Sequence, residues 1–158
     1  MKRIRLAFYH GNFFIRWQTR SDYSHVATVF EDGLVVEALF WDGVIQRQWT
    51  EEDAIISDVY YVEVTVEQYI RFRTWVTQQI GSPYDRLGVL RFLSRRKHWA
   101  TDSWFCSELP FYAFAKLLDI WLQRNIEPWA VSPALLSISP LLRAEENRLW
   151  RTTSHSAR

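Results

Sequence analysis

The chain of 158 residues contains a single cysteine, Cys106. One thiol cannot form an intrachain disulfide, and it cannot supply the paired cysteines of the common structural zinc sites. The thiol is therefore either a small apolar residue of the core or a reactive group.

An excess of charge of one sign is also missing. Lys and Arg number 19 and Asp and Glu 18, for a formal net charge of +1, which argues against a nucleic-acid binder. No stretch approaches the roughly 20 consecutive apolar residues of a transmembrane helix. The apolar run at the N-terminus is broken by His10 and Asn12, so it is a poor secretory signal. We expect no integral membrane segment and a cytoplasmic location, where a lone thiol stays reduced.

Large apolar residues are abundant, with 48% of the chain hydrophobic and 16% aromatic. A chain of this length can build one core and is too short for two comfortable domains. We expect a single domain over residues 1–151, followed by a flexible polar tail over 152–158. The sequence makes no prediction of oligomeric state.

The first 64 residues are typical of β-structure. Two apolar runs, 25–30 and 34–38, flank Glu31-Asp-Gly33, which is the signal of a β-hairpin. Further strands are expected at 4–9, 43–49 and 57–64, with a short turn or helix over 50–54.

The hydrophobic period changes at Thr65, which forms a capping box with Gln68 and so predicts a helix start. The apolar residues of this helix recur at spacings of three and four, on one face: Val66, Tyr69, Phe72, Val76 and Ile80. Gly81 follows where a C-terminal glycine belongs.

Residues 106–123 are apolar on nearly every side, which predicts a buried helix. Pro110 must lie in the first turn of this helix, so we expect it to begin near Cys106 or Ser107. A last apolar segment, 133–138, is bracketed by prolines. The expected fold class is α+β, with a small antiparallel sheet packed against the buried helix that carries the cysteine.

The position of Cys106 at a helix start is chemically informative. Backbone amides and the helix dipole favour negative charge there, and a thiolate is a good nucleophile when a base is near. A free cysteine is also common as a core residue. Helix position alone does not decide whether Cys106 is a nucleophile or a core residue.

A base for this thiol must come from four histidines. His155 lies in the tail, His98 follows the polar run Arg95-Arg-Lys97, and His10 ends the first strand. His25 opens a strand that should pack on the core, which would give its ring a fixed direction. A structural histidine at the sheet edge is the alternative.

Glu37 interrupts an otherwise apolar strand beside the strand that His25 opens. A buried carboxylate costs several kcal/mol unless it is paired or hydrogen-bonded, and an imidazole N–H is a suitable partner. A carboxylate that orients a histidine facing a nucleophile is the logic of a catalytic triad. An outward-facing Glu37 on a half-solvated strand is the alternative.

Short motifs occur in a characteristic order along the chain. They are Ser24-His-Val-Ala-Thr-Val-Phe30, Asp32-Gly-Leu-Val-Val-Glu-Ala38, Gly43-Val44, Gly81-Ser-Pro-Tyr-Asp85, Trp104-Phe-Cys-Ser-Glu-Leu109 and Val131-Ser-Pro-Ala-Leu135. In order and spacing they resemble the circularly permuted branch of the NlpC/P60 papain-like superfamily, most of all its YiiX/YaeF-like members. The resemblance runs from about Ile4 to Leu136.

The resemblance implies a permuted papain-like fold and a thiol hydrolase. Cys106 would be the nucleophile, His25 the general base and Glu37 the residue that orients it. Substrates would be small peptides or amides, often of cell-wall type, cleaved through an acyl-enzyme without a cofactor or metal. Tyr84 would donate a hydrogen bond to the oxyanion, together with the helix-start amide near Cys106; a buried loop tyrosine is the alternative.

Two other classes of function remain open. An acyltransferase or thioesterase of the lecithin:retinol acyltransferase type shares the permuted fold, but its Asn-Cys-Glu-His motif differs from Phe105-Cys-Ser-Glu108. The Trp-rich surface and the basic cluster 91–97 would suit its lipid-bearing substrates, although a solvated helix face is the favoured interpretation of the cluster. The aromatic segment 11–23 is a candidate lining of a substrate groove. The second open class of function is a non-catalytic binding or structural protein on the same fold. Metal binding through His25, Glu37 and Cys106 has no supporting ligand spacing.

Overall fold

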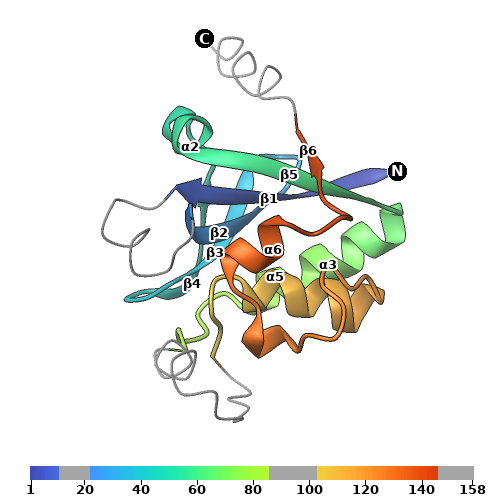
Figure 1. The fold of residues 1–158 in the computed structure, drawn as a ribbon. Helices are drawn as coiled ribbons and strands as arrows, with labels where there is room; N and C mark the ends of the chain where they lie inside the picture. The colour runs from blue at the N-terminus through green and yellow to red at the C-terminus, as the bar shows by residue number, and fades with distance from the viewer. Residues whose placement is uncertain (11–21, 86–102, 146–158) are drawn as a thin grey trace.

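A computed structural model describes residues 1–10, 22–85 and 103–145 (Figure 1). The basic cluster 91–97, His98 and the tail 152–158 with His155 lie outside the described residues, as does most of the aromatic segment 11–23. The predictions made for these segments stay predictions.

One sheet of six antiparallel strands organises the described part of the chain, in the order β4-β3-β2-β1-β5-β6. The strands are β1 (Lys2–His10), β2 (Tyr23–Val29), β3 (Leu34–Leu39), β4 (Gly43–Gln48), β5 (Ser57–Val64) and β6 (Arg143–Ala144). The first five strands confirm the sequence prediction with small shifts at their ends. The sequence does not predict β6, because two residues carry no detectable periodicity.

The strands β1, β2 and β3 carry buried residues on both faces of the sheet. In β1, Ile4, Leu6 and Phe8 belong to the larger core, whereas Ala7 and Tyr9 belong to a smaller one. This alternation follows from the two-residue period of a strand. Figure 1 shows α3, α5 and α6 on one side of the sheet and α2 on the other.

The helix α3 (Val66–Gln78) is the element that the sequence predicts best. Thr65 accepts a hydrogen bond from the backbone of Gln68, and the Gln68 side chain accepts one from the backbone of Thr65, as a capping box requires. Gly81 follows the helix with a φ of 91°, a conformation that favours glycine. The buried residues of this helix are Tyr69, Phe72 and Val76.

The helix after the cysteine is shorter than predicted. It comprises α5 (Glu108–Tyr112) and a π-helical turn (Ala113–Leu117), with Ser107 as its N-cap and Pro110 in the first turn, as expected. The prediction that it extends to residue 123 is wrong. Asp119 adopts a left-handed backbone with a φ of 54°, which ends the helix although the following residues are still apolar.

Three short helices complete the described structure: α2 (Glu51–Ile56), the 3-10 helix η2 (Pro128–Ala130) and α6 (Pro133–Ser137). The fold is thus a mixture of α and β structure built on an antiparallel sheet, which agrees with the expected class. Within the described ranges, no helix has both the length and the apolar character needed to cross a membrane.

Candidate functional site

Cys106 lies in the larger core, two residues before α5, and its exposed fraction is 3%. The turn around it is tied down by its neighbours. The Ser107 hydroxyl donates a hydrogen bond to the carbonyl oxygen of Val131 at 2.6 Å. The backbone N–H of Leu109 donates to the carbonyl oxygen of Phe105 at 3.2 Å. The thiol therefore has a fixed position at the start of the helix.

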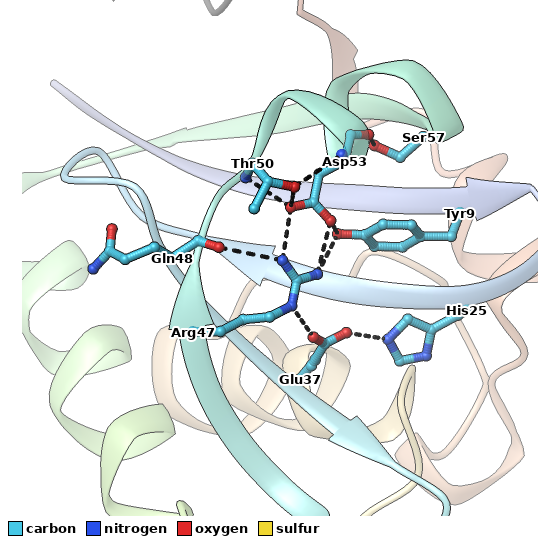
Figure 2. Close-up of polar contacts among 8 residues, drawn as sticks. All are labelled: Tyr9, His25, Glu37, Arg47, Gln48, Thr50, Asp53 and Ser57. Carbon is cyan, nitrogen blue, oxygen red and sulfur yellow. Dashed lines mark hydrogen bonds and ion pairs between the residues drawn. The ribbon is translucent and has the colours of Figure 1, made fainter. Parts of the chain in front are cut away.

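His25, in β2, connects this thiol to the sheet. Its Nε2 lies 2.6 Å from Oε2 of Glu37 (Figure 2), and Cys106 lies close enough to the ring to raise the pKa of His25. A carboxylate only accepts hydrogen bonds, so Nε2 carries the hydrogen and Nδ1 is the nitrogen that remains for the thiol. The structure thus brings the three predicted triad residues together.

The charge state of His25 follows from these two partners. Burial disfavours the charged ring, but hydrogen bonds with Cys106 and Glu37, and the charges of both groups, raise the pKa of His25 to about 9. At neutral pH the ring is therefore mostly an imidazolium.

Glu37, in β3, is the buried carboxylate that the sequence suggests. Only 4% of its side chain is exposed, so the alternative of an outward-facing glutamate is wrong. Burial favours the neutral form, but hydrogen bonds from His25 and Arg47 outweigh it and hold the pKa of Glu37 below its ordinary value. Glu37 is thus held as a carboxylate facing His25.

Arg47, in β4, is a member of the site that sequence reasoning missed. Its Nε donates to Oε1 of Glu37 at 2.6 Å (Figure 2). Glu37 pairs with Ile45 across the β3–β4 hairpin, which makes Arg47 its diagonal neighbour. Opposite charges at such diagonal positions are a recognised stabilising pair. The register of this hairpin is the signal that points to the contact between Arg47 and Glu37.

Behind Arg47 lies Asp53, in the first turn of α2. Asp53 binds both terminal nitrogens of the guanidinium, at 2.7 and 2.8 Å, and accepts a hydrogen bond from the Tyr9 hydroxyl at 2.8 Å. Despite burial, these contacts and those with Thr50 lower the pKa of Asp53 to about 2. The spacing Thr50-x-x-Asp53 is a capping pattern that the sequence offers for this residue.

Tyr84 lies beside the cysteine, as the resemblance implies. It forms an isolated bridge with Trp104, two residues before Cys106, and its ring packs on Phe105 and Phe40 at centroid distances of 5.9 and 5.5 Å. Burial and the negative charge that Cys106 can carry raise the pKa of Tyr84. Tyr84 therefore stays protonated and can donate a hydrogen bond.

Glu108 is a second residue that the sequence did not single out. It lies two positions after Cys106, and its carboxylate accepts a hydrogen bond from the backbone N–H of Phe105 at 3.4 Å. Burial raises the pKa of Glu108 to about 7. The hydrogen bond from Phe105 lowers this pKa, and the negative charge of Asp85 raises it further. Glu108 helps to shape the turn that presents the thiol.

The other histidine of the described chain has a different partner. Nε2 of His10 lies 3.2 Å from Oδ2 of Asp58, and its ring packs on Tyr23. His10 is therefore paired with a carboxylate other than Glu37.

Across residues 1–10, 22–85 and 103–145, no group of three or more His, Cys, Asp or Glu residues is arranged to hold a metal ion. No protein-family model matches the chain, and no curated protein matches its sequence.

Proposed function

We propose that the chain is a cysteine hydrolase, a peptidase or amidase, that cleaves an amide bond through an acyl-enzyme on Cys106. His25 acts as general base and acid, and Glu37 orients its ring. One observation carries this proposal: Nε2 of His25 lies 2.6 Å from the buried Glu37 carboxylate, and the buried Cys106 lies close enough to the same ring to raise the pKa of His25. A core cysteine without a chemical role needs no such partner.

The reaction follows from these positions. The Cys106 thiolate attacks the carbonyl carbon, and the imidazolium of His25 gives its proton to the leaving amine as the C–N bond breaks. Neutral His25 then takes a proton from water, and the resulting hydroxide attacks the thioester. The acid product leaves, and the thiolate and imidazolium are restored. Glu37 stays ionised throughout and stabilises the charged ring.

The negative oxygen that forms in both steps requires hydrogen-bond donors. Tyr84 and the backbone N–H of Cys106 are our candidates. The neutral hydroxyl of Tyr84 and its place beside the thiol support this role. Oxyanion donors of this kind commonly contribute roughly 10²- to 10³-fold in rate.

The chain order also supports a permuted papain-like fold. The histidine and the acidic residue lie early, on two neighbouring strands, and the cysteine lies late, at the start of a helix. Together with the motifs quoted above, this order favours the circularly permuted NlpC/P60 branch. Peptides of cell-wall type are the substrates that this resemblance suggests.

One observation favours a second candidate, an acyltransferase or thioesterase of the lecithin:retinol acyltransferase type. Phe40 and Trp41 are exposed, Trp41 by 77%, and Phe40 packs on Tyr84 near the thiol. Exposed aromatic side chains can bind the acyl chain of a lipid-bearing substrate. Members of that group usually have a second histidine as the third residue of the site, whereas this chain has Glu37. This candidate is therefore the weaker one.

Alkylation by iodoacetamide tests the proposal directly, because Cys106 is the only cysteine and each adduct is an event at this residue. At pH 7 we expect Cys106 to react much faster than a free thiol, although it is buried, and His25→Ala to abolish this advantage. Slow alkylation of the folded protein, equal in His25→Ala, would contradict catalysis and leave a binding or structural role.

Trapping of an intermediate separates the two enzyme classes. A mass increase on Cys106 from a peptide or amide substrate, absent in Cys106→Ala, supports the hydrolase. Acyl transfer that occurs only from a phospholipid to an amine supports the acyltransferase.

A further inference from the structure

The guanidinium of Arg47 uses all of its hydrogen-bond donors within this site (Figure 2). Nε donates to Glu37 at 2.6 Å. Nη1 donates to Asp53 at 2.7 Å and to the carbonyl oxygen of Gln48 at 3.3 Å. Nη2 donates to Asp53 at 2.8 Å and to the Tyr9 hydroxyl at 3.0 Å. Because the guanidinium is a rigid planar fork with five N–H groups, these contacts fix both its position and its plane.

The fixed guanidinium determines how the Glu37 carboxylate is turned. The two oxygens of Glu37 have separate partners, with Oε1 on Arg47 and Oε2 on His25, both at 2.6 Å. A carboxylate held by His25 alone could rotate about its last side-chain bond, because that torsion is broad. The second contact removes this freedom and directs Oε2 to the histidine.

Arg47 also balances the buried charge of the site. The side chains of Glu37 and Asp53 are 4% and 6% exposed, and a buried carboxylate without a partner is strongly disfavoured. One guanidinium pairs with both. Without it, Oε1 of Glu37 would lose its partner, and the carboxylate would be freer to turn and easier to protonate. Either change would weaken the hold of Glu37 on His25.

We propose that Arg47, clamped by Asp53, is a positioning residue that holds Glu37 in the orientation in which His25 directs Nδ1 to the Cys106 thiol. This inference rests on the proposed function, because it assigns Arg47 a role in activating the same nucleophile. Arg47 contacts no reacting atom and acts through Glu37 and then His25.

The rate of alkylation by iodoacetamide, measured from pH 4 to pH 10 on the full chain, tests the proposal without a known substrate. In the wild-type protein we expect fast alkylation at pH 6 from the imidazolium–thiolate pair, well above that of His25→Ala. In Arg47→Met we expect the rate at pH 6 to fall roughly tenfold or more, by analogy with the loss of a partner behind a metal-ligating histidine. Arg47→Lys should restore the rate in part, because an ammonium keeps the charge but cannot bind Glu37 and both oxygens of Asp53.

A matched control removes a different ion pair. Arg73 pairs with Asp32 at 2.6 Å, and Arg73→Met should leave the pH profile of alkylation unchanged. Proton NMR adds a readout that loss of stability alone does not move. The hydrogen on Nε2 of His25 should give a far-downfield resonance in the wild-type protein and in Arg73→Met, and this resonance should shift or disappear in Arg47→Met.

The outcomes separate this inference from the proposed function. A folded Arg47→Met variant with the wild-type profile and resonance overturns the role of Arg47 while the hydrolase proposal stands. A wild-type profile equal to that of His25→Ala overturns the hydrolase proposal itself. If Arg47→Met does not fold, Asp53→Asn decides: a reduced rate at pH 6 supports the clamp, and a wild-type profile overturns it.

Discussion

Oε2 of Glu37 lies 2.6 Å from Nε2 of His25, on the neighbouring strand. The backbone pairing of β2 with β3 joins Thr28 to Val36 and Val29 to Val35, and it includes neither His25 nor Glu37. The contact between Glu37 and His25 is therefore made by the side chains and is separate from the backbone pairing of the two strands. Both oxygens of Glu37 act as acceptors, because His25 donates to Oε2 and Arg47 donates to Oε1.

This double use of Glu37 predicts the effect of Glu37→Gln. An amide offers one oxygen where the carboxylate offers two, so either Arg47 or His25 must face an NH₂ group. If Arg47 keeps the oxygen, His25 is forced to carry its hydrogen on Nδ1, the wrong tautomer for a base. We expect turnover to fall by roughly 10²- to 10⁴-fold, as when the acid of a triad becomes an amide.

The same variant can be checked before a substrate is known, by iodoacetamide alkylation at pH 6. Glu63→Gln is the matched control, since Glu63 pairs with Arg143 at 3.0 Å on β5. We expect the control to react like the wild-type protein and Glu37→Gln to react more slowly. Equal rates in all three proteins would show that Glu37 does not orient the histidine.

The pKa of His25 gives a second prediction. Cys106 contributes a hydrogen bond and a charge to the rise of this pKa to about 9. Cys106→Ala removes both and leaves Glu37, so the pKa of His25 should fall toward the ordinary value of about 6.5. An NMR titration of the ring C–H resonances measures the shift. An unchanged pKa would mean that the thiol and the ring do not interact.

The sequence predicts part of the site and not the rest, for physical reasons. Cys106, His25 and Glu37 are detectable because each breaks a pattern: a thiol at a helix start, and two polar residues in apolar strands. Arg47 and Asp53 follow ordinary patterns, a charge in an edge strand and an acidic residue in a first helical turn. Their roles depend on the strand register and on where α2 packs, which no local signal specifies.

The fold shows the same division. The capping box of α3 and the Asp-Gly turn before β3 are local features, and the structure confirms the elements that they predict. The end of the cysteine helix depends instead on the left-handed conformation of Asp119. Apolar residues continue beyond it because they pack in the core, so hydrophobicity alone predicts a helix that is too long.

Gly43 gives a third prediction, about the segment that carries Tyr84. The φ of Gly43 is 74°, and a Cβ there would clash with the carbonyl oxygen of Ser82. That oxygen accepts a hydrogen bond from the backbone N–H of Val44 at 2.8 Å. Gly43→Ala should therefore both strain the turn and push residues 82–84 away from β4.

We expect Gly43→Ala to lower the free energy of unfolding by more than the roughly 1–3 kcal/mol of a left-handed non-glycine residue. Gly81→Ala is the control, because Gly81 has a φ of 91° but no atom within 4 Å of an added Cβ. Denaturant unfolding of the two variants separates the clash from the backbone strain. Equal losses in the free energy of unfolding would show that residues 82–84 move to accommodate the added Cβ without a further loss of stability.

Asp53 gives a fourth prediction, about stability in acid. Its pKa in the folded chain is about 2, below the ordinary value of 3.8. The ionised form therefore contributes stability that is complete above about pH 4 and is lost as the pH falls through 2. We expect this contribution to be about 1–2 kcal/mol once solvent screening is allowed for.

Asp53→Asn should start less stable at neutral pH and lose less stability between pH 5 and pH 2 than the wild-type protein, because the amide does not titrate. Urea unfolding at a series of pH values measures both slopes. Asp32→Asn is the control, since Asp32 pairs with Arg73 but 52% of its side chain is exposed, so solvent weakens the pair. If Asp53→Asn and the wild-type protein keep the same slope, the clamp on Arg47 adds nothing to the stability of the folded chain.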